Sequence, residues 1–515
     1  MTQYLKMNES SSKIQIIFEI ANNHQGSISH FENILNNINN SIKGYEDFFD
    51  FKVKFQFRDL PTFIDQSIDP NSNKHIQRFR DTELTKKNWL QIIKLVKSKG
   101  LKVMVTPFDE ISVQKAIEFG VDEFKIASCS CTEWSLLEEV LLFKKPLTIS
   151  TGGRNLSEVD KIYSYLASQI PNKFTIMHCC GIYPAPSSSL NLNTIRKFID
   201  RYPLAKIGYS GHEDPSDHFI SSLAVSLGAV SLERHIGKED KEKNIKLNTY
   251  SIDSKFIGKW LEQIKNTIIC LGTPKSHNYF NQTEIDSLKT LQRGVVLNKK
   301  VYAGSIINPK DCIFKFPIQE NQIPASQICS NDYNHYAKFD IESGSRITND
   351  LVEKKLKENI LLKEYIHKIR GIINEYGECV PRDVSLEISH HYGLEKIDEY
   401  GCCLITIVNR NYCKKLIIMT KGQSHPTQHH KIKEETFRIL HGELELLLND
   451  EKNILKLGDE ALVKVGHKHA FKANTDCIFE EISSTSINDD SYYDDEKVNS
   501  MKRVDRKSIS KLHFS

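Results

Sequence analysis

The sequence predicts an α/β protein in which a (β/α)8 barrel is followed by a small domain of short strands and a C-terminal all-β barrel. The first observation is a series of eight apolar runs of strand length in the first half of the chain, with helical patterns between them. The second is that several runs are apolar on successive residues, as buried parallel strands are. The third is a change near residue 285 to short strands separated by Gly and Asn turns.

The eight runs justify the barrel, which we place within residues 1–275. Helical patterns fill the gaps, for example TKKNWLQIIKLVKSKG before the third run and SVQKAIEFG before the fourth. Eight strands that alternate with helices favour a closed parallel barrel over an open sheet. The runs are IQIIFEIA, FFDFKVKFQF, LKVMVTPF, EFKIAS, PLTIST, FTIMHCC, KIGYSG and VSLERHI.

The rest of the chain divides into four parts. Residues 285–352 form the small domain, in which the phrase KKVYAGSIINPKD is echoed by KFDIESGSRITND. Residues 353–374 have the charge and apolar spacing of an amphipathic connector helix. Residues 375–497 contain strands separated by glycine turns, which is typical of a small β-barrel. Residues 498–515 are a charged tail that we expect to be disordered in part.

Charge and composition exclude several classes of protein. The chain of 515 residues has 69 Lys and Arg and 66 Asp and Glu, a net charge of +3, so no large field of one sign calls for nucleic acid or a membrane surface. Its 12 cysteines show no repeated spacing, which fits a reducing compartment. The first 13 residues are polar, and no apolar run approaches the roughly 18 residues of a membrane span. We therefore expect a cytoplasmic protein without nucleic-acid or membrane partners.

Polar side chains gather where the predicted strands end, which is where such barrels carry their chemistry. His212 and His235 end neighbouring strands, so their imidazoles can converge on a divalent ion such as Mn²⁺ or Mg²⁺. Lys54 and Lys125 would offer positive charge to a small phosphorylated carboxylate. The other candidates at the strand ends are Glu19, Gln56, Thr106, Ser128, Ser150 and Tyr183. An ion pair or a buried polar group explains any one of them alone, so the prediction depends on all eight strand ends together.

Eight segments, in order, resemble the motif series of the sialic acid (N-acetylneuraminate) synthase family: IIFEIANNHQGS, VKFQ, TPFDE, FKIASC, ISTGG, MHCCGIYPAP, GYSGHE and LERHI. Residues 285–352 are similar to the SAF, or antifreeze-like, domain that follows the barrel in that family. The resemblance implies an enzyme that condenses phosphoenolpyruvate with N-acetylmannosamine or a related acetamido aldose and releases phosphate. It also implies a homodimer.

The same resemblance implies roles for individual residues. His212 and His235 would hold the metal, and Glu19 would orient the sugar or the attacking water. The residues implied to contact phosphoenolpyruvate are Lys54, Thr106, Lys125, Ser128 and Ser150.

Two departures from the family pattern leave the acceptor sugar open. Asn248 stands where the family has an aspartate that contacts the sugar, and Phe316 stands where it has an arginine. Two alternatives therefore remain beside the sialic acid synthase. One is a related phosphoenolpyruvate-dependent deoxy-sugar-acid synthase with a different aldose acceptor. The other is a non-catalytic protein with a carbohydrate-binding or regulatory role.

The last domain resembles the cupin family through two glycine-framed motifs, except that Gln428 occupies the position of the first histidine. The resemblance implies that His430, Glu435 and His469 face inward and form a site for a second divalent metal. A metal site and a metal-free sugar-binding role both fit these residues.

Overall fold

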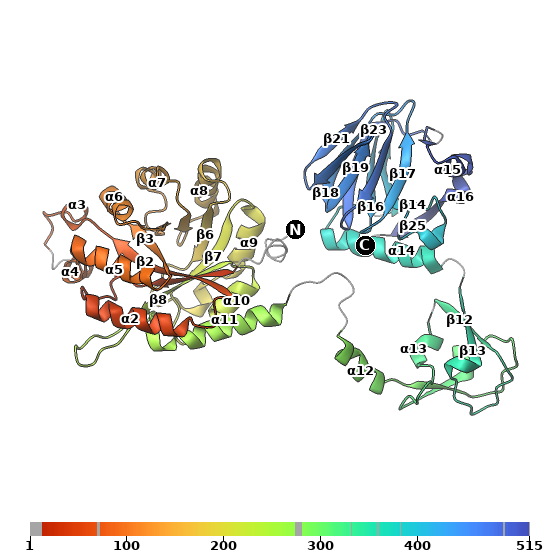
Figure 1. The fold of residues 1–515 in the computed structure, drawn as a ribbon, viewed down its shortest axis with the longest axis horizontal. Coiled ribbons are helices and arrows are strands. Elements are labelled where there is room, and N and C mark those ends of the chain that lie inside the picture. The colour runs from red at the N-terminus through yellow and green to blue at the C-terminus, as the bar shows by residue number, and fades with distance from the viewer. Residues whose placement is uncertain are drawn as a thin grey trace. The chain divides into compact units, whose positions relative to one another are not determined.

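The computed structural model describes residues 13–69, 73–272, 281–330, 332–357, 360–381, 383–487 and 490–513. They belong to two compact units, Met1–Asn278 and Tyr279–Ser515 (Figure 1). Within these described ranges, no helix has the length and apolar character that crossing a membrane requires.

The first unit is a closed barrel of eight parallel strands, as the sequence predicts. Each strand pairs with the next, and β8 pairs with β1 to close the barrel, while a short β9 (Ile252–Asp253) pairs in parallel with the end of β8. The barrel strands are β1 (Ile14–Glu19), β2 (Phe49–Phe57), β3 (Lys102–Pro107), β4 (Glu123–Ile126), β5 (Leu147–Ser150), β6 (Phe174–Cys179), β7 (Lys206–Gly211) and β8 (Ser231–Gly237). Their successive apolar residues are buried because helices cover the outside and side chains fill the inside.

Helices connect the strands and surround the barrel (Figure 1). They are α2 (Ile28–Ser41), α5 (Lys86–Ser98), α6 (Glu110–Glu118), α7 (Trp134–Leu141), α8 (Leu156–Gln169), α9 (Asn193–Arg201), α10 (Phe219–Ser226) and α11 (Ile257–Leu271). The connection after β2 is longer and contains α3 (Leu60–Phe63) and α4 (Lys74–Asp81). Asp109 caps α6 by accepting a hydrogen bond from the amide of Ser112 (2.7 Å) and also accepts one from the amide of Asp59 (2.9 Å). This carboxylate therefore ties the start of the long connection to α6.

The second unit begins with α12 (Gln282–Thr290) and four short antiparallel strands, β10 (Gly294–Leu297), β11 (Cys312–Lys315), β12 (Tyr333–Ala337) and β13 (Val352–Leu356). A short helix, α13 (Ala325–Ile328), lies between β11 and β12 in the chain. The two similar phrases meet where Val301 and Ile341 exchange backbone hydrogen bonds of 2.9 and 2.8 Å. The predicted connector helix over 353–374 is wrong at its start. Residues Val352–Leu356 pair with β12, and helix α14 spans Ile360–Tyr376.

The remaining strands form two antiparallel sheets, which confirms an all-β C-terminal region. The larger sheet has the order β21-β18-β23-β16-β15-β14-β25 and the smaller β20-β19-β22-β17-β24. Side chains between the sheets, such as Phe437, Phe471 and Phe479, form one core, while Ile369 of α14 packs on the larger sheet in another. The strands are β14 (Asp383–Ser389), β15 (Cys402–Asn409), β16 (Tyr412–Met419), β17 (Ser424–His429), β18 (Glu435–His441), β19 (Glu443–Leu448), β20 (Glu451–Lys456), β21 (Glu460–Val463), β22 (His469–Ala473), β23 (Cys477–Ser484), β24 (Tyr492–Tyr493) and β25 (Lys507–His513).

The charged tail predicted over 498–515 is more ordered than we expected. After α15 (Glu496–Ser500) and α16 (Arg503–Arg506), the strand β25 (Lys507–His513) pairs along the whole of β14. Two basic residues of the tail help to hold it in place, because the carboxylate of Glu387 on β14 forms ion pairs with Arg503 and with Lys507 (2.5 Å). Charge alone therefore did not indicate disorder here.

One buried ion pair beside the barrel gives a stability prediction. The side chains of Arg234 and Glu213 are fully buried and lie 2.6 Å apart, and the Tyr209 hydroxyl donates to Glu213 (2.9 Å). Replacing Arg234 by Met should lower the free energy of unfolding of the barrel by about 3–5 kcal/mol, because Glu213 would keep a buried charge without its partner. Denaturant unfolding of the wild type and the variant measures this loss.

The control for this prediction is Arg201→Met. Arg201 forms a similar bond to Asp160 (2.6 Å), but both side chains are exposed, so we expect a much smaller loss of stability. An equal decrease in the free energy of unfolding of the two variants would contradict the prediction that burial makes the Arg234 ion pair more important for stability.

Candidate active site at the carboxyl ends of the barrel strands

A cavity at the carboxyl ends of the strands receives a side chain from every strand of the barrel. It is lined by Glu19, Lys54, Gln56, Thr106, Lys125, Ala127, Ser128, Ser150, Cys179, Tyr183, Ser210, His212, Glu233 and His235. All the residues that we predicted for the barrel site are among them except Asn248. A wider cavity of about 810 Å³ adjoins this one and shares Gln56, Ser128, Cys179 and Tyr183 with it.

Two lysines and two carboxylates form the buried floor of the site. Glu233 lies between the ammonium groups of Lys54 (3.1 Å) and Lys125 (2.8 Å) and accepts a hydrogen bond from the Ser210 hydroxyl (3.0 Å). Lys54 also forms an ion pair with Glu19. The floor thus brings two cations and two anions together away from water.

The two carboxyl groups differ in proton affinity. Burial alone would raise the pKa of Glu233, but Lys125 and Lys54 outweigh it and hold this pKa below its usual range. Burial raises the pKa of Glu19, which Lys54 offsets only in part and the charge of Glu233 reinforces. Glu19 Oε1 is buried and has no hydrogen-bond partner among the described residues. Glu233 is therefore a lasting anion, and Glu19 is the carboxyl group that can exchange a proton.

His212 and His235 lie together at the edge of the floor, with ring centres 5.4 Å apart. His212 Nδ1 is held 3.0 Å from the Cys180 carbonyl oxygen, to which it donates, so Nε2 is the free nitrogen. Burial lowers the pKa of His212 to about 4 and that of His235 well below its usual value. Neutral imidazoles, one oriented by a backbone carbonyl, are suitable ligands for a divalent metal. The residues present therefore fit the metal that the resemblance implies.

The role of Asn248 stays a prediction, and sequence reasoning missed its neighbour Tyr250. The side chain of Asn248 does not line the cavity but accepts a hydrogen bond from the amide of Tyr250 (3.2 Å). It thereby helps to place the Tyr250 ring, whose centre lies 5.1 Å from His235 and 5.2 Å from Tyr183. Phe316, the second departure, is exposed directly after β11.

Glu233 is the other important residue that the candidate list left out. It stands two positions before His235 on β8, and side chains two apart on a strand point the same way. That spacing is the signal that could have identified it.

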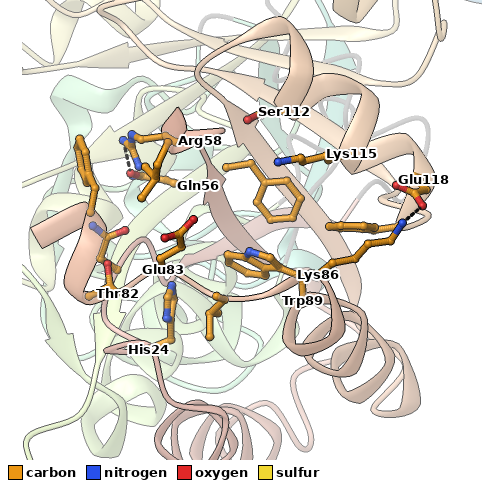
Figure 2. Close-up of a pocket in the computed structure, with 16 residues that line it drawn as sticks. His24, Gln56, Arg58, Thr82, Glu83, Lys86, Trp89, Ser112, Lys115 and Glu118 are labelled. Carbon is orange, nitrogen blue, oxygen red and sulfur yellow. Dashed lines mark hydrogen bonds and ion pairs between the residues drawn. The ribbon is translucent and has the colours of Figure 1, made fainter. Parts of the chain in front are cut away.

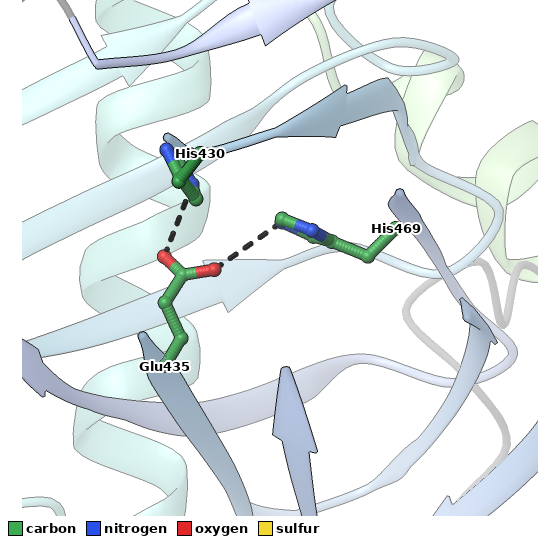
Figure 3. Close-up of side chains that lie close together, drawn as sticks. All are labelled: His430, Glu435 and His469. Atoms are coloured by element: carbon green, nitrogen blue, oxygen red, sulfur yellow. Dashed lines mark ion pairs between the residues drawn. The ribbon is translucent and has the colours of Figure 1, made fainter. Parts of the chain in front are cut away.

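A separate cluster in the second unit brings His430, Glu435 and His469 together, as the sequence predicts (Figure 3). All three are buried, and the Nε2 atoms of His430 and His469 lie 3.4 and 3.3 Å from the two carboxylate oxygens of Glu435. Their Nδ1 atoms face backbone carbonyls, of Asp490 for His430 and of His467 for His469 (3.3 Å). Lys433 forms ion pairs with Glu435 and with Glu481 (2.9 Å), so a cation already shares the carboxylate.

Comparison with known proteins shows which family the chain resembles. Residues 51–276 match the NeuB family. The crystal structure of a protein from Chromobacterium violaceum described as spore coat polysaccharide biosynthesis protein E is 34% identical, with a TM-score of 0.61 over 66% of this chain and 100% of that chain. N,N'-diacetyllegionaminic acid synthase of Legionella pneumophila is 26% identical over 61% of this chain and 88% of its own. Human N-acetylneuraminate-9-phosphate synthase is 25% identical over 57% and 80%. The chain therefore belongs to the NeuB family, the family of the sialic acid synthases.

Proposed function

We propose that this protein is a nonulosonic acid synthase that condenses phosphoenolpyruvate with an acetamido aldose and releases phosphate. The observation that carries the proposal is the convergence of two lysines, three predicted hydroxyl groups and two histidines on one cavity at the strand ends. The relatives support it, because their names describe synthases of diacetyllegionaminic acid and of N-acetylneuraminate 9-phosphate.

Phosphoenolpyruvate would bind over the floor of the site. When Glu19 carries a proton, the charges of Lys54 and Lys125 exceed that of Glu233 by one, which favours a bound anion. The Ser150 hydroxyl is buried and has no partner among the described residues, so it is free to donate to a phosphate or carboxylate oxygen. Thr106 and Ser128 offer two further hydroxyl groups to the same ligand.

The carbon–carbon bond would form beside the histidines. His212 and His235 would hold a divalent ion, Mn²⁺ or Mg²⁺, which when bound polarises the aldehyde oxygen of the open-chain acceptor. C3 of phosphoenolpyruvate then attacks the aldehyde carbon, water adds at C2, and phosphate leaves with cleavage of its carbon–oxygen bond. Glu19 would accept a proton from that water or return one to the new hydroxyl group.

A second divalent metal is proposed at His430, Glu435 and His469. Two buried imidazoles and a carboxylate are a common ligand set, and the backbone carbonyls at both Nδ1 atoms leave both Nε2 atoms directed at the centre. An ion there would share Glu435 with Lys433.

The metal in the barrel is tested by His235→Ala. We expect this variant to lose one equivalent of bound Mn²⁺ and to release phosphate from phosphoenolpyruvate and N-acetylmannosamine about a thousandfold more slowly, since a metal ion supplies several kcal/mol at the transition state. Metal analysis and a phosphate assay measure both effects. His178→Gln is the control, because His178 lies outside the histidine pair and contacts the Leu190 carbonyl oxygen (2.6 Å). Full activity in His235→Ala would refute the assignment.

The proposed second site is tested by counting metal in Glu435→Gln. Replacing the carboxylate by an amide removes its charge, so we expect this variant to lose one equivalent of Mn²⁺ while the barrel keeps its own. Glu481→Gln is the matched control, since Glu481 also pairs with Lys433 but contacts neither histidine. A wild-type protein that binds a single equivalent, all of it lost in His235→Ala, would refute the second site.

A further inference from the structure

A second cavity of the barrel, of about 250 Å³, lies beside the candidate active site (Figure 2). Gln56 lines both cavities and the wider one as well, so this side chain stands where the three adjoin. The end of β2, the connection that follows it, α5 and α6 form most of its walls. The apolar part of the lining consists of Phe57, Leu60, Phe79, Leu84, Trp89 and Phe119.

Arg58 is held rigidly in this cavity. Its guanidinium carbon lies 3.8 Å from the ring centre of Phe108 and 4.1 Å from that of Phe79, and Nη2 donates to Gln56 Oε1 (2.9 Å). Figure 2 shows the arginine turned toward Gln56. Burial lowers the pKa of Arg58 to about 10, so the group is still charged at neutral pH. Its Nε is buried and has no hydrogen-bond partner among the described residues.

The other basic side chains of these cavities are neutralised. Lys86 pairs with Glu118, Lys115 with Asp59 (2.5 Å) and Arg154 with Glu158 (3.3 Å). Lys54 and Lys125 share Glu233. Among the cavity-lining lysines and arginines in the described ranges, Arg58 alone forms no ion pair with a carboxylate. Glu83 lines the same cavity but is exposed and makes no ion pair with Arg58.

A partly buried guanidinium with a free donor edge and no counter-ion is costly unless a ligand supplies the charge. We propose that the acceptor aldose carries an oxyanion group, phosphate or carboxylate, at the end remote from its aldehyde, and that Arg58 binds this group. This inference rests on the proposed function. The acceptor would extend from His212 and His235 past Gln56 toward Arg58. The aromatic rings that fix the guanidinium plane prepare it for an oxyanion, which accepts two parallel hydrogen bonds.

The test compares three acceptors, each with phosphoenolpyruvate: N-acetylmannosamine, its 6-phosphate and N-acetylmannosaminuronic acid. We expect the wild type to have its lowest KM for one of the two anionic acceptors. Which of the two it is shows whether Arg58 binds a phosphate or a carboxylate. Arg58→Met should raise that KM by about 10- to 100-fold, the effect of losing a charge-assisted hydrogen bond, with little change in kcat or in the KM of phosphoenolpyruvate. Arg58→Lys should restore part of the affinity, because it keeps the charge without the planar fork.

Lys86→Met is the matched control, since it removes one positive charge from the same cavity where Glu118 already compensates it. We expect less than about a twofold change in KM. Preference of the wild type for the neutral sugar, or equal selectivity in the wild type and Arg58→Met, would overturn the inference.

Failure of the proposed function gives a different result, because no aldose then leads to consumption of phosphoenolpyruvate. Calorimetry with the same sugars decides the inference in that case. Tighter binding of an anionic sugar to the wild type than to Arg58→Met supports it, and equal binding refutes it. Should the Met variant not fold, the wild-type panel and Arg58→Lys decide in the same way.

Discussion

The carboxylate of Glu233, shared by two buried ammonium groups, is the interaction on which the candidate active site depends. Lys54 and Lys125 approach it from β2 and β4, strands that are not neighbours, so without it two like charges would face each other inside the barrel. Their positions fix where an anion can bind. Burial is the main cause of the raised pKa of Glu19, and the charge of Glu233 adds to it while Lys54 offsets it in part.

Much of the barrel could be predicted because its signals are local. Runs of successive apolar residues identify buried parallel strands, and parallel strands bring their carboxyl ends to one place, so His212 and His235 could be paired from sequence. The packing of the Arg58 guanidinium on two aromatic rings could not be predicted from sequence. Phe79 and Phe108 belong to separate connections that only folding brings together. Tyr250 could not be identified either, because only the folded connection after β8 places its ring beside that of His235.

The two histidine clusters follow one physical rule in unrelated frameworks. In each, burial lowers the pKa of an imidazole and a backbone carbonyl lies at its Nδ1, so that Nε2 is the nitrogen that does not face the carbonyl. They differ in their carboxylates. Glu19 has one oxygen without a partner, whereas Glu435 is engaged by Lys433 and by both histidines. The carboxylate of the second cluster is therefore shared with an ammonium group and two histidines, whereas the Glu19 carboxylate keeps an unpaired oxygen among the described residues.

The pairing of β14 with β25 has a consequence for how the chain folds during synthesis. The barrel closes where β8 pairs with β1, and β8 ends at Gly237. All eight strands of the barrel have therefore been synthesised once Gly237 has been added. The larger β-sheet, in contrast, lacks its outermost strand until residues 507–513 follow, long after β14. The barrel can thus fold early during synthesis, whereas the edge of β14 stays unpaired until the last strand of the sheet has been made. An unpaired strand edge is prone to aggregation, so a chaperone would be most useful during this interval.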